Sequence, residues 1–110
     1  MINSILTAAG IPHSRGRFAR PPASTYAVYM DDLTVDGADR VAADRLPGIV
    51  THDVTIELYE AEPDDKAEAA IEAALDDQGL PWTKQDRYWL QDALRYQVVY
   101  EFTYNEKRRT

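Results

Sequence analysis

The chain has 110 residues, a net charge of −7 and no cysteine. This length predicts one domain spanning residues 1–110, and the lack of cysteine excludes disulfides, thiolate metal sites and thiol catalysis. No apolar run approaches the roughly 20 residues of a transmembrane helix. The N-terminus also lacks the basic region and long apolar run of a secretory signal. We therefore expect no membrane partner.

Charge is segregated along the chain. Residues 1–30 carry three arginines and no acid, residues 31–80 carry fifteen acids against three bases, and residues 81–110 carry four acids against six bases. The net charges are +3, −12 and +2. An acidic middle between basic ends fits contact between subunits, although a solvated acidic helix with basic tails would give the same pattern. The candidate contact residues are Arg15, Arg17, Arg20, Asp64, Asp65, Asp76, Asp77, Lys107, Arg108 and Arg109.

The N-terminal half predicts a short helix and two strands. An apolar stripe runs from Ile2 to Ala9, Asn3 or Ser4 can cap its start, and Gly10 ends it. A basic loop then leads through two prolines into an extended segment over 26–30.

Residues 31–48 are polar and contain Asp36-Gly37, a two-residue hairpin signal, so a hairpin or a long loop is expected there. Alternation over 49–60 predicts a strand whose apolar face includes His52. We interpret this histidine as a hydrogen-bonded core residue.

The second helix is clearly marked at both ends. Pro63 suits the first helical position, and Asp64 and Asp65 are favourable at the positive end of the helix dipole. Gly79 suits the left-handed position after the helix, where Leu80 would pack on Leu75.

The C-terminal part predicts a strand over 82–89, a turn at Gln91-Asp92 and a long final strand. The solvent-exposed face of this final strand would consist of Arg95, Gln97, Glu101 and Thr103. The buried face would consist of Leu94, Tyr96, Val98, Tyr100, Phe102 and Tyr104.

The predicted fold class is therefore α+β, with element order α-β-(β)-β-α-β-β. Hairpin connections make the sheet mainly antiparallel, with four to five strands, and two helices pack on one face.

Nothing in the chain nominates an enzyme site. Residues 32–37 begin like a calcium loop, but Ala43 stands where the bidentate glutamate is required. Adjacent acids such as Asp76-Asp77 diverge into water rather than converge in a pocket. The basic clusters are small for a nucleic-acid site in an acidic chain. We expect no catalytic residue, no cofactor and no metal, and a function that resides in protein contact surfaces.

Several segments together resemble one protein family. They are Gly10-Ile11-Pro12, the double proline before Tyr26-Ala27-Val28-Tyr29, Val54-Thr-Ile-Glu-Leu-Tyr59, the Ala-Ile-Glu-Ala-Ala-Leu helix after Pro63, and Tyr96-Gln-Val-Val-Tyr100-Glu-Phe102. In their order and spacing they resemble the small tail terminator proteins, also called tail-completion or head–tail joining proteins, of long-tailed bacteriophages and prophages. The resemblance covers almost the whole chain.

This resemblance implies a virion structural protein at the neck, assembled in the host cytoplasm. Six copies would form a ring that caps the tail tube, stops its growth and joins it to the neck or head-completion protein. DNA would only pass through the lumen. The alternatives are another neck component, such as a stopper or adaptor, and a small non-catalytic α+β ligand-binding module. A hydrolase using the acidic cluster is the weakest alternative.

Overall fold

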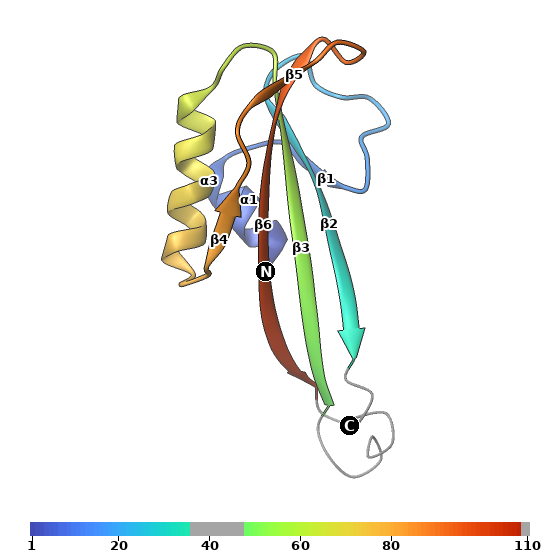
Figure 1. The fold of residues 1–110 in the computed structure, drawn as a ribbon, viewed down its shortest axis with the longest axis vertical. Coiled ribbons are helices and arrows are strands. Elements are labelled where there is room, and N and C mark those ends of the chain that lie inside the picture. The colour runs from blue at the N-terminus through green and yellow to red at the C-terminus, as the bar shows by residue number, and fades with distance from the viewer. Residues whose placement is uncertain (36–47, 109–110) are drawn as a thin grey trace.

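The computed structural model describes residues 1–35 and 48–108 (Figure 1). Within these residues, two helices and six strands follow one another. In order they are α1 (Ile2–Ala9), β1 (His13–Arg15), β2 (Tyr26–Val35), β3 (Gly48–Glu60), α3 (Asp65–Asp77), β4 (Trp82–Lys84), β5 (Tyr88–Leu90) and β6 (Arg95–Arg108).

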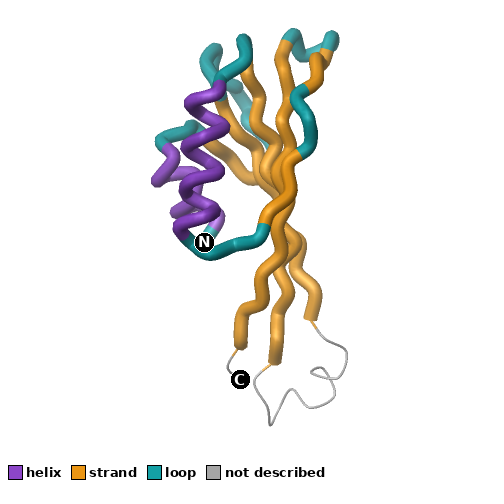
Figure 2. The backbone as a smooth tube through the Cα atoms, turned by 60° about the vertical axis from the view of Figure 1, so that its left-hand side comes forward, coloured by secondary structure: helices purple, strands orange, loops and turns teal. Residues whose placement is uncertain are grey.

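The strands form one open, mostly antiparallel sheet. Its order is β1-β2-β3-β6-β4, and β5 also pairs with β6. Among these described strands, only β1 and β2 pair in parallel. Both helices lie on the same side of the sheet (Figure 2). The predicted α+β class and helix placement are confirmed, with six strands rather than four to five.

Three short strands account for that difference. The loop that leads into β2 contains β1, which pairs with Ala27–Tyr29. The strand predicted over 82–89 is two three-residue strands with a break between Lys84 and Tyr88. β2 continues beyond its predicted end at residue 30 through Val35, and the predicted Asp36-Gly37 turn lies outside the described residues.

Both helices end as their Gly-apolar-Pro sequences predict. Gly79 has φ +69°, and the amide of Leu80 donates to the carbonyl of Leu75 at 3.2 Å. Gly10 and Ile11 repeat this arrangement at the end of α1.

The predicted helix starts are wrong by two or three residues. The N-cap of α1 is Met1, without a side-chain cap, rather than Asn3 or Ser4. In α3 the N-cap is Asp64, whose carboxylate accepts from the amide of Ala67 at 3.0 Å. Pro63 therefore precedes the cap. The Asp64 carboxylate accepts a hydrogen bond from a backbone amide of the first turn, which a proline side chain cannot do.

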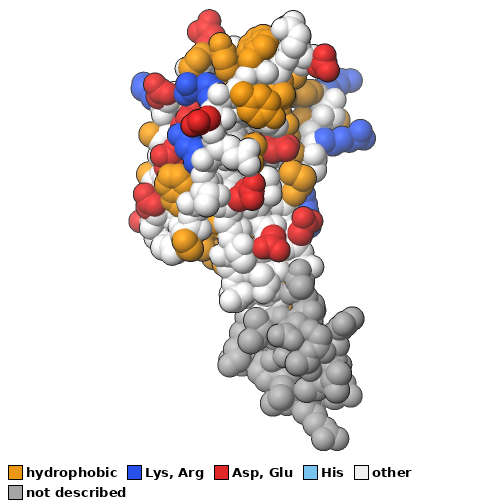
Figure 3. Space-filling model, in the orientation of Figure 1, with side chains coloured by type: hydrophobic (Ala, Val, Ile, Leu, Met, Phe, Trp, Pro, Cys, Tyr) orange, Lys and Arg blue, Asp and Glu red, His pale blue; other side chains and the backbone are white. Residues whose placement is uncertain are grey.

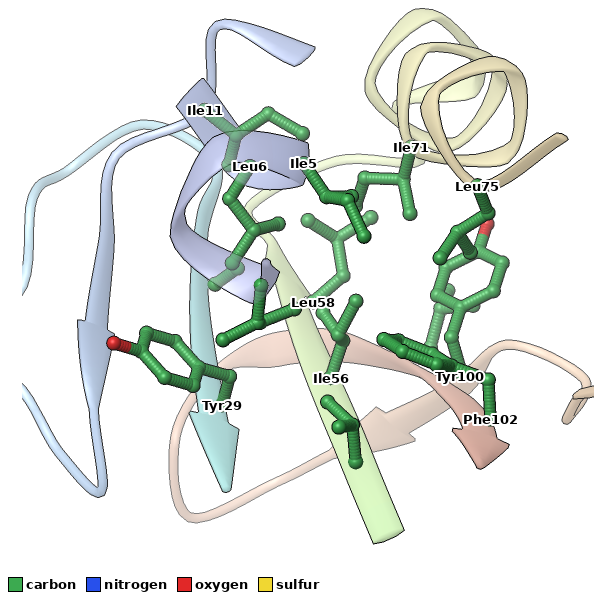
Figure 4. Packing of buried hydrophobic residues seen from close by; sticks show 14 of the residues in the cluster. Ile5, Leu6, Ile11, Tyr29, Ile56, Leu58, Ile71, Leu75, Tyr100 and Phe102 are labelled. Carbon is green, nitrogen blue, oxygen red and sulfur yellow. The ribbon is translucent and has the colours of Figure 1, made fainter. Parts of the chain in front are cut away.

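The core lies between the helices and the facing side of β2, β3 and β6 (Figure 4). Ile5 and Leu6 of α1 and Ile71 and Leu75 of α3 are at most 2% exposed. The strand residues buried beneath them are Ala27, Tyr29, Val54, Ile56, Leu58, Val98, Tyr100 and Phe102.

The molecule is elongated, with extents of 51 × 28 × 22 Å. Its radius of gyration of 16.1 Å exceeds the roughly 13 Å expected for a compact chain of this length. The reason is visible in Figure 2, where three strands continue well beyond the helices. We call this part, residues 30–35, 48–53 and 103–108, the sheet extension.

Candidate assembly surfaces

The sheet extension carries a histidine bracketed by two carboxylates. Nδ1 of His52 lies 2.9 Å from a carboxylate oxygen of Asp31, and Nε2 lies 3.1 Å from one of Glu106. The imidazole stacks on Tyr104 with ring centroids 4.3 Å apart, and burial raises the pKa of the Tyr104 hydroxyl. His52 is hydrogen-bonded and buried, as predicted, but it lies in the sheet extension and outside the main core cluster.

A charged cluster joins the β4–β5 segment to the corner between β3 and α3. The guanidinium of Arg87 donates to Glu60 at 3.0 Å, to Asp65 at 2.9 Å and to Glu68. Glu60 is fully buried and the Glu68 side chain is only 7% exposed. The cluster therefore attaches the segment between β4 and β5 to the rest of the fold.

The two buried glutamates affect each other's ionisation. Burial, and then a hydrogen bond to Glu68 and its negative charge, raise the pKa of Glu60 to about 7. One oxygen of Glu60 has no partner unless it is protonated and donates to Glu68. Burial alone would raise the pKa of Glu68, but hydrogen bonds from Glu60, Lys84 and Arg87 lower it. The pair is therefore a single titrating unit.

A second branch of the cluster reaches the core through Tyr100. Its hydroxyl donates to Glu72 at 2.7 Å, and Lys84 bridges Glu72 and Glu68 at 2.7 and 2.9 Å. Burial and the bond to Glu72 raise the pKa of Tyr100. These groups satisfy one another inside the fold, as buried polar groups must.

The side of the sheet away from the helices has an aromatic layer. Tyr26 and Tyr59 stack with centroids 5.1 Å apart, Phe18 meets Tyr26 edge-on at 5.3 Å, and Arg95 lies over Tyr26. Arg95 also donates to the carbonyls of residues 22–24 at 2.9–3.1 Å. This arrangement fixes the basic loop against the sheet.

Gln97 and Leu94 differ from the predicted burial along the final strand. Gln97 is only 8% exposed, because its amide donates to the hydroxyl of Tyr59 at 3.1 Å. Leu94 lies in the turn before β6 with φ +52° and is 61% exposed. The rest of the buried face is confirmed, with Tyr96 and Tyr104 at its half-buried ends.

Exposed apolar side chains gather around the β5–β6 turn. Tyr88, Trp89 and Leu94 are 50%, 42% and 61% exposed, and hydrophobic groups are visible at that end of the molecule in Figure 3.

The predicted contact residues do not form one surface. Arg17 and Arg20 are exposed in the loop after β1, while Arg15 donates to the carbonyl of Asp31 at 3.3 Å. The other basic cluster begins at the opposite end of the sheet. There Lys107 and Arg108 pair with Ile49 and Gly48, while Arg109 lies outside the described residues.

The acidic candidates separate in the same way. Asp64 and Asp65 lie at the start of α3, whereas Asp76 and Asp77 lie at its end. Asp64 caps the helix and accepts from Thr25 at 2.6 Å, and Asp76 accepts from the indole of Trp82 at 2.9 Å. Asp65, Asp76 and Asp77 are exposed, and Asp64 is half-buried.

The sequence interpretation missed the pairing of Glu60 with Glu68. The available signal was Glu60 itself, which continues the even-numbered buried face of β3.

Neither of two hollows on the surface is lined by Glu60 or Glu68. One, of about 390 Å³, lies beside β4, and the other, of about 550 Å³, lies between the end of α1 and the start of α3.

Residues 1–35 and 48–108 carry neither a metal site nor a membrane-spanning helix. No three histidine, cysteine or acidic side chains are placed there to hold a metal ion. Neither helix is long and apolar enough to cross a membrane.

The fold has counterparts among solved structures. No protein-family model matches the chain, and no curated protein matches it significantly. Fourteen chains of solved structures do match. One belongs to the virion of a native gene transfer agent particle, with a TM-score of 0.59 and 17% identity, covering 94% of this chain and 84% of that chain. The protein therefore shares its fold with a chain from a gene transfer agent virion.

Proposed function

We propose that this chain is a virion structural protein, a tail terminator whose copies form a ring on the finished tail tube. The observation that carries the proposal is the match in fold to a chain of a gene transfer agent virion, over 94% of this chain. The sequence resemblance to tail terminators supports the same role independently.

The arrangement of the molecule fits an assembly role better than catalysis. The buried carboxylates satisfy one another and neighbouring cations within the fold. By contrast, three strands extend beyond the helices, and the side chains of Tyr88 and Trp89 are exposed. In this role the partners are further copies of the chain, the tail tube protein and a neck or head-completion protein. DNA passes only through the lumen, and the location is the neck of the virion.

The test is to mix the purified protein with the tail tube protein of the same virion and to image the products by electron microscopy. We expect a ring, with six subunits if the resemblance holds, at one end of each tube, and an arrest of tube growth. Tubes assembled alone are the control. Tubes that keep growing without a ring at either end would contradict the proposal. A ring that binds only the neck protein would favour a stopper or adaptor.

A further inference from the structure

One outer edge of the sheet extension belongs to β2. The amide of Ala27 donates to Pro12 and the carbonyl of Tyr29 accepts from Gly16, so the odd-numbered residues of β2 direct their backbone groups towards β1. Because the direction of the backbone groups repeats at every second residue of a strand, the backbone groups of Asp31, Leu33 and Val35 also point outward, away from β3. Among the described residues no strand pairs with them there, and only the carbonyl of Asp31 has a partner, the Arg15 guanidinium.

The other outer edge belongs to β6. The carbonyl of Val99 accepts from the amide of Gln85, so odd-numbered residues of β6 face β4. The β4 pairing stops at Phe102. The backbone groups of Thr103, Asn105 and Lys107 therefore face outward, without a neighbouring strand in the part of the chain that the structure describes.

The two edges match each other in direction, length and height. Both β2 and β6 are antiparallel to β3, so they run in the same direction. Asp31 and Phe102 both pair with Val54. The two edges therefore lie on opposite flanks of β3 and at the same height, that is, at the same position along the strand direction. Each edge offers three outward-facing residues.

We infer that β2 of one copy pairs in parallel with β6 of the next, joining the sheet extensions into one continuous sheet. The inference rests on the proposed ring and identifies the contact that builds it. Unpaired edges are templates for another strand. A two-fold dimer through β2 would leave β6 unpaired, whereas a head-to-tail ring satisfies both edges of every subunit.

The side chains of the extension are compatible with this pairing. Leu33, His52 and Tyr104 form one row across the three strands, and Leu33 at the end of the row is 53% exposed. Pairing at equal height places Leu33 beside Tyr104 of the next copy. Nearer the helices, the short strands β1 and β4 already cover both edges, so pairing is confined to the extension.

Proline substitution tests the two edges separately. Proline removes an amide donor and is tolerated only where that donor faces outward. We expect Leu33→Pro and Asn105→Pro to abolish the ring in size-exclusion chromatography and microscopy, while circular dichroism and thermal melting show a folded monomer. Leu33→Ser and Asn105→Ala are matched controls that keep the backbone N–H group, and both variants should assemble into rings.

Disulfide trapping tests which residues of β2 and of β6 from the next copy lie on the same face of the joined sheet. It also tests the inference if a proline variant unfolds. The chain has no native cysteine. Leu33→Cys is combined in turn with Tyr104→Cys and Glu106→Cys, which lie on the same face, and with Asn105→Cys, which lies on the opposite face. Oxidation should give ladders of linked subunits on non-reducing gels with a same-face partner only, because a shift of one residue reverses the facing.

The outcomes separate this inference from the proposed function. Intact rings with both proline variants, or no cross-link with either same-face partner, would overturn edge pairing while the tail terminator role stands. Rings that persist with Leu33→Pro but no longer cap tubes would assign the β2 edge to the tube protein and also overturn it. A wild-type protein that forms no ring, alone or with tube protein, would overturn both.

Discussion

Glu60 shows how strongly burial controls a single carboxyl group in this fold. Its pKa rises from 4.5 to about 7 on folding, because burial and the nearby Glu68 disfavour its charged form. The folded state therefore holds the proton more tightly than the unfolded state between these values. This contribution to stability is complete below about pH 4.5 and is lost as the pH rises through about 7. The lowered pKa of Glu68 acts in the opposite direction, at lower pH.

The first prediction concerns Glu60→Gln. A glutamine keeps an acceptor for Arg87 and a donor for Glu68 but cannot ionise. We expect the variant to be more stable than the wild type at pH 8 by about 1–2 kcal/mol, with little difference at pH 5. Urea unfolding at several pH values measures both quantities. Asp65→Asn is the control, because it removes an exposed carboxylate from the same guanidinium and should keep the wild-type pH dependence. A destabilised Glu60→Gln at pH 8 would mean that the ion pair with Arg87 outweighs desolvation.

The second prediction concerns Gly79, whose φ of +69° is a left-handed conformation. A Cβ there would have no neighbouring atom within 4 Å, so the cost of a side chain is purely conformational. Gly79→Ala should cost about 1 kcal/mol, and Gly79→Asn less, because asparagine tolerates this region better. Thermal melting of the three proteins gives the order. An alanine variant as stable as the wild type would show that the helix end adapts.

At the scale of elements, β6 carries the third prediction. Tyr100 is fully buried, whereas its neighbour Glu101 is exposed. Tyr100→Ala should cost about 3–5 kcal/mol, as truncation of a core aromatic does, and Glu101→Ala less than about 1 kcal/mol. Tyr100→Phe separates the ring from the hydroxyl and should lose only the hydrogen bond to Glu72, about 1 kcal/mol. Denaturant unfolding measures all three, and the reverse order of the two alanine variants would contradict the facing of the strand.

The periodicity of apolar residues in the sequence predicted the elements in which that periodicity is long. It missed the features that depend on contacts with neighbouring elements of the fold. Alternation was enough for β3 and most of β6, and helix-end residues were enough for the end of α3. A three-residue strand such as β1 is too short for a pattern and exists because β2 lies beside it. Likewise Gln97 looks exposed by alternation, but Tyr59 from a neighbouring strand supplies its partner. The pairing of Glu60 with Glu68 also depends on how α3 folds back over the sheet.

At the scale of the whole molecule, the charge segregation of the sequence becomes a separation in space. The basic loop after β1 lies beside the helix-covered part of the sheet, and the basic end of β6 lies at the far end of the sheet extension. Acids at the two ends of α3 lie apart as well. A subunit therefore has different charges on different surfaces, which suits a head-to-tail ring better than a symmetric dimer.

The last prediction tests whether charge guides that assembly. Arg17 and Arg20 are exposed, so Arg17→Glu with Arg20→Glu should leave the melting temperature almost unchanged but weaken ring formation at low salt. Exposed pairs contribute only about 0–1 kcal/mol each, so the effect should fall on encounter rate and register, and high salt should reduce the difference from the wild type. Asp65→Lys with Asp77→Lys should partly restore assembly. Asp64 and Asp76 are left unchanged because they hold the ends of α3. Sizing and microscopy at two salt concentrations measure assembly, and unchanged rings of the arginine variant at low salt would reject charge matching.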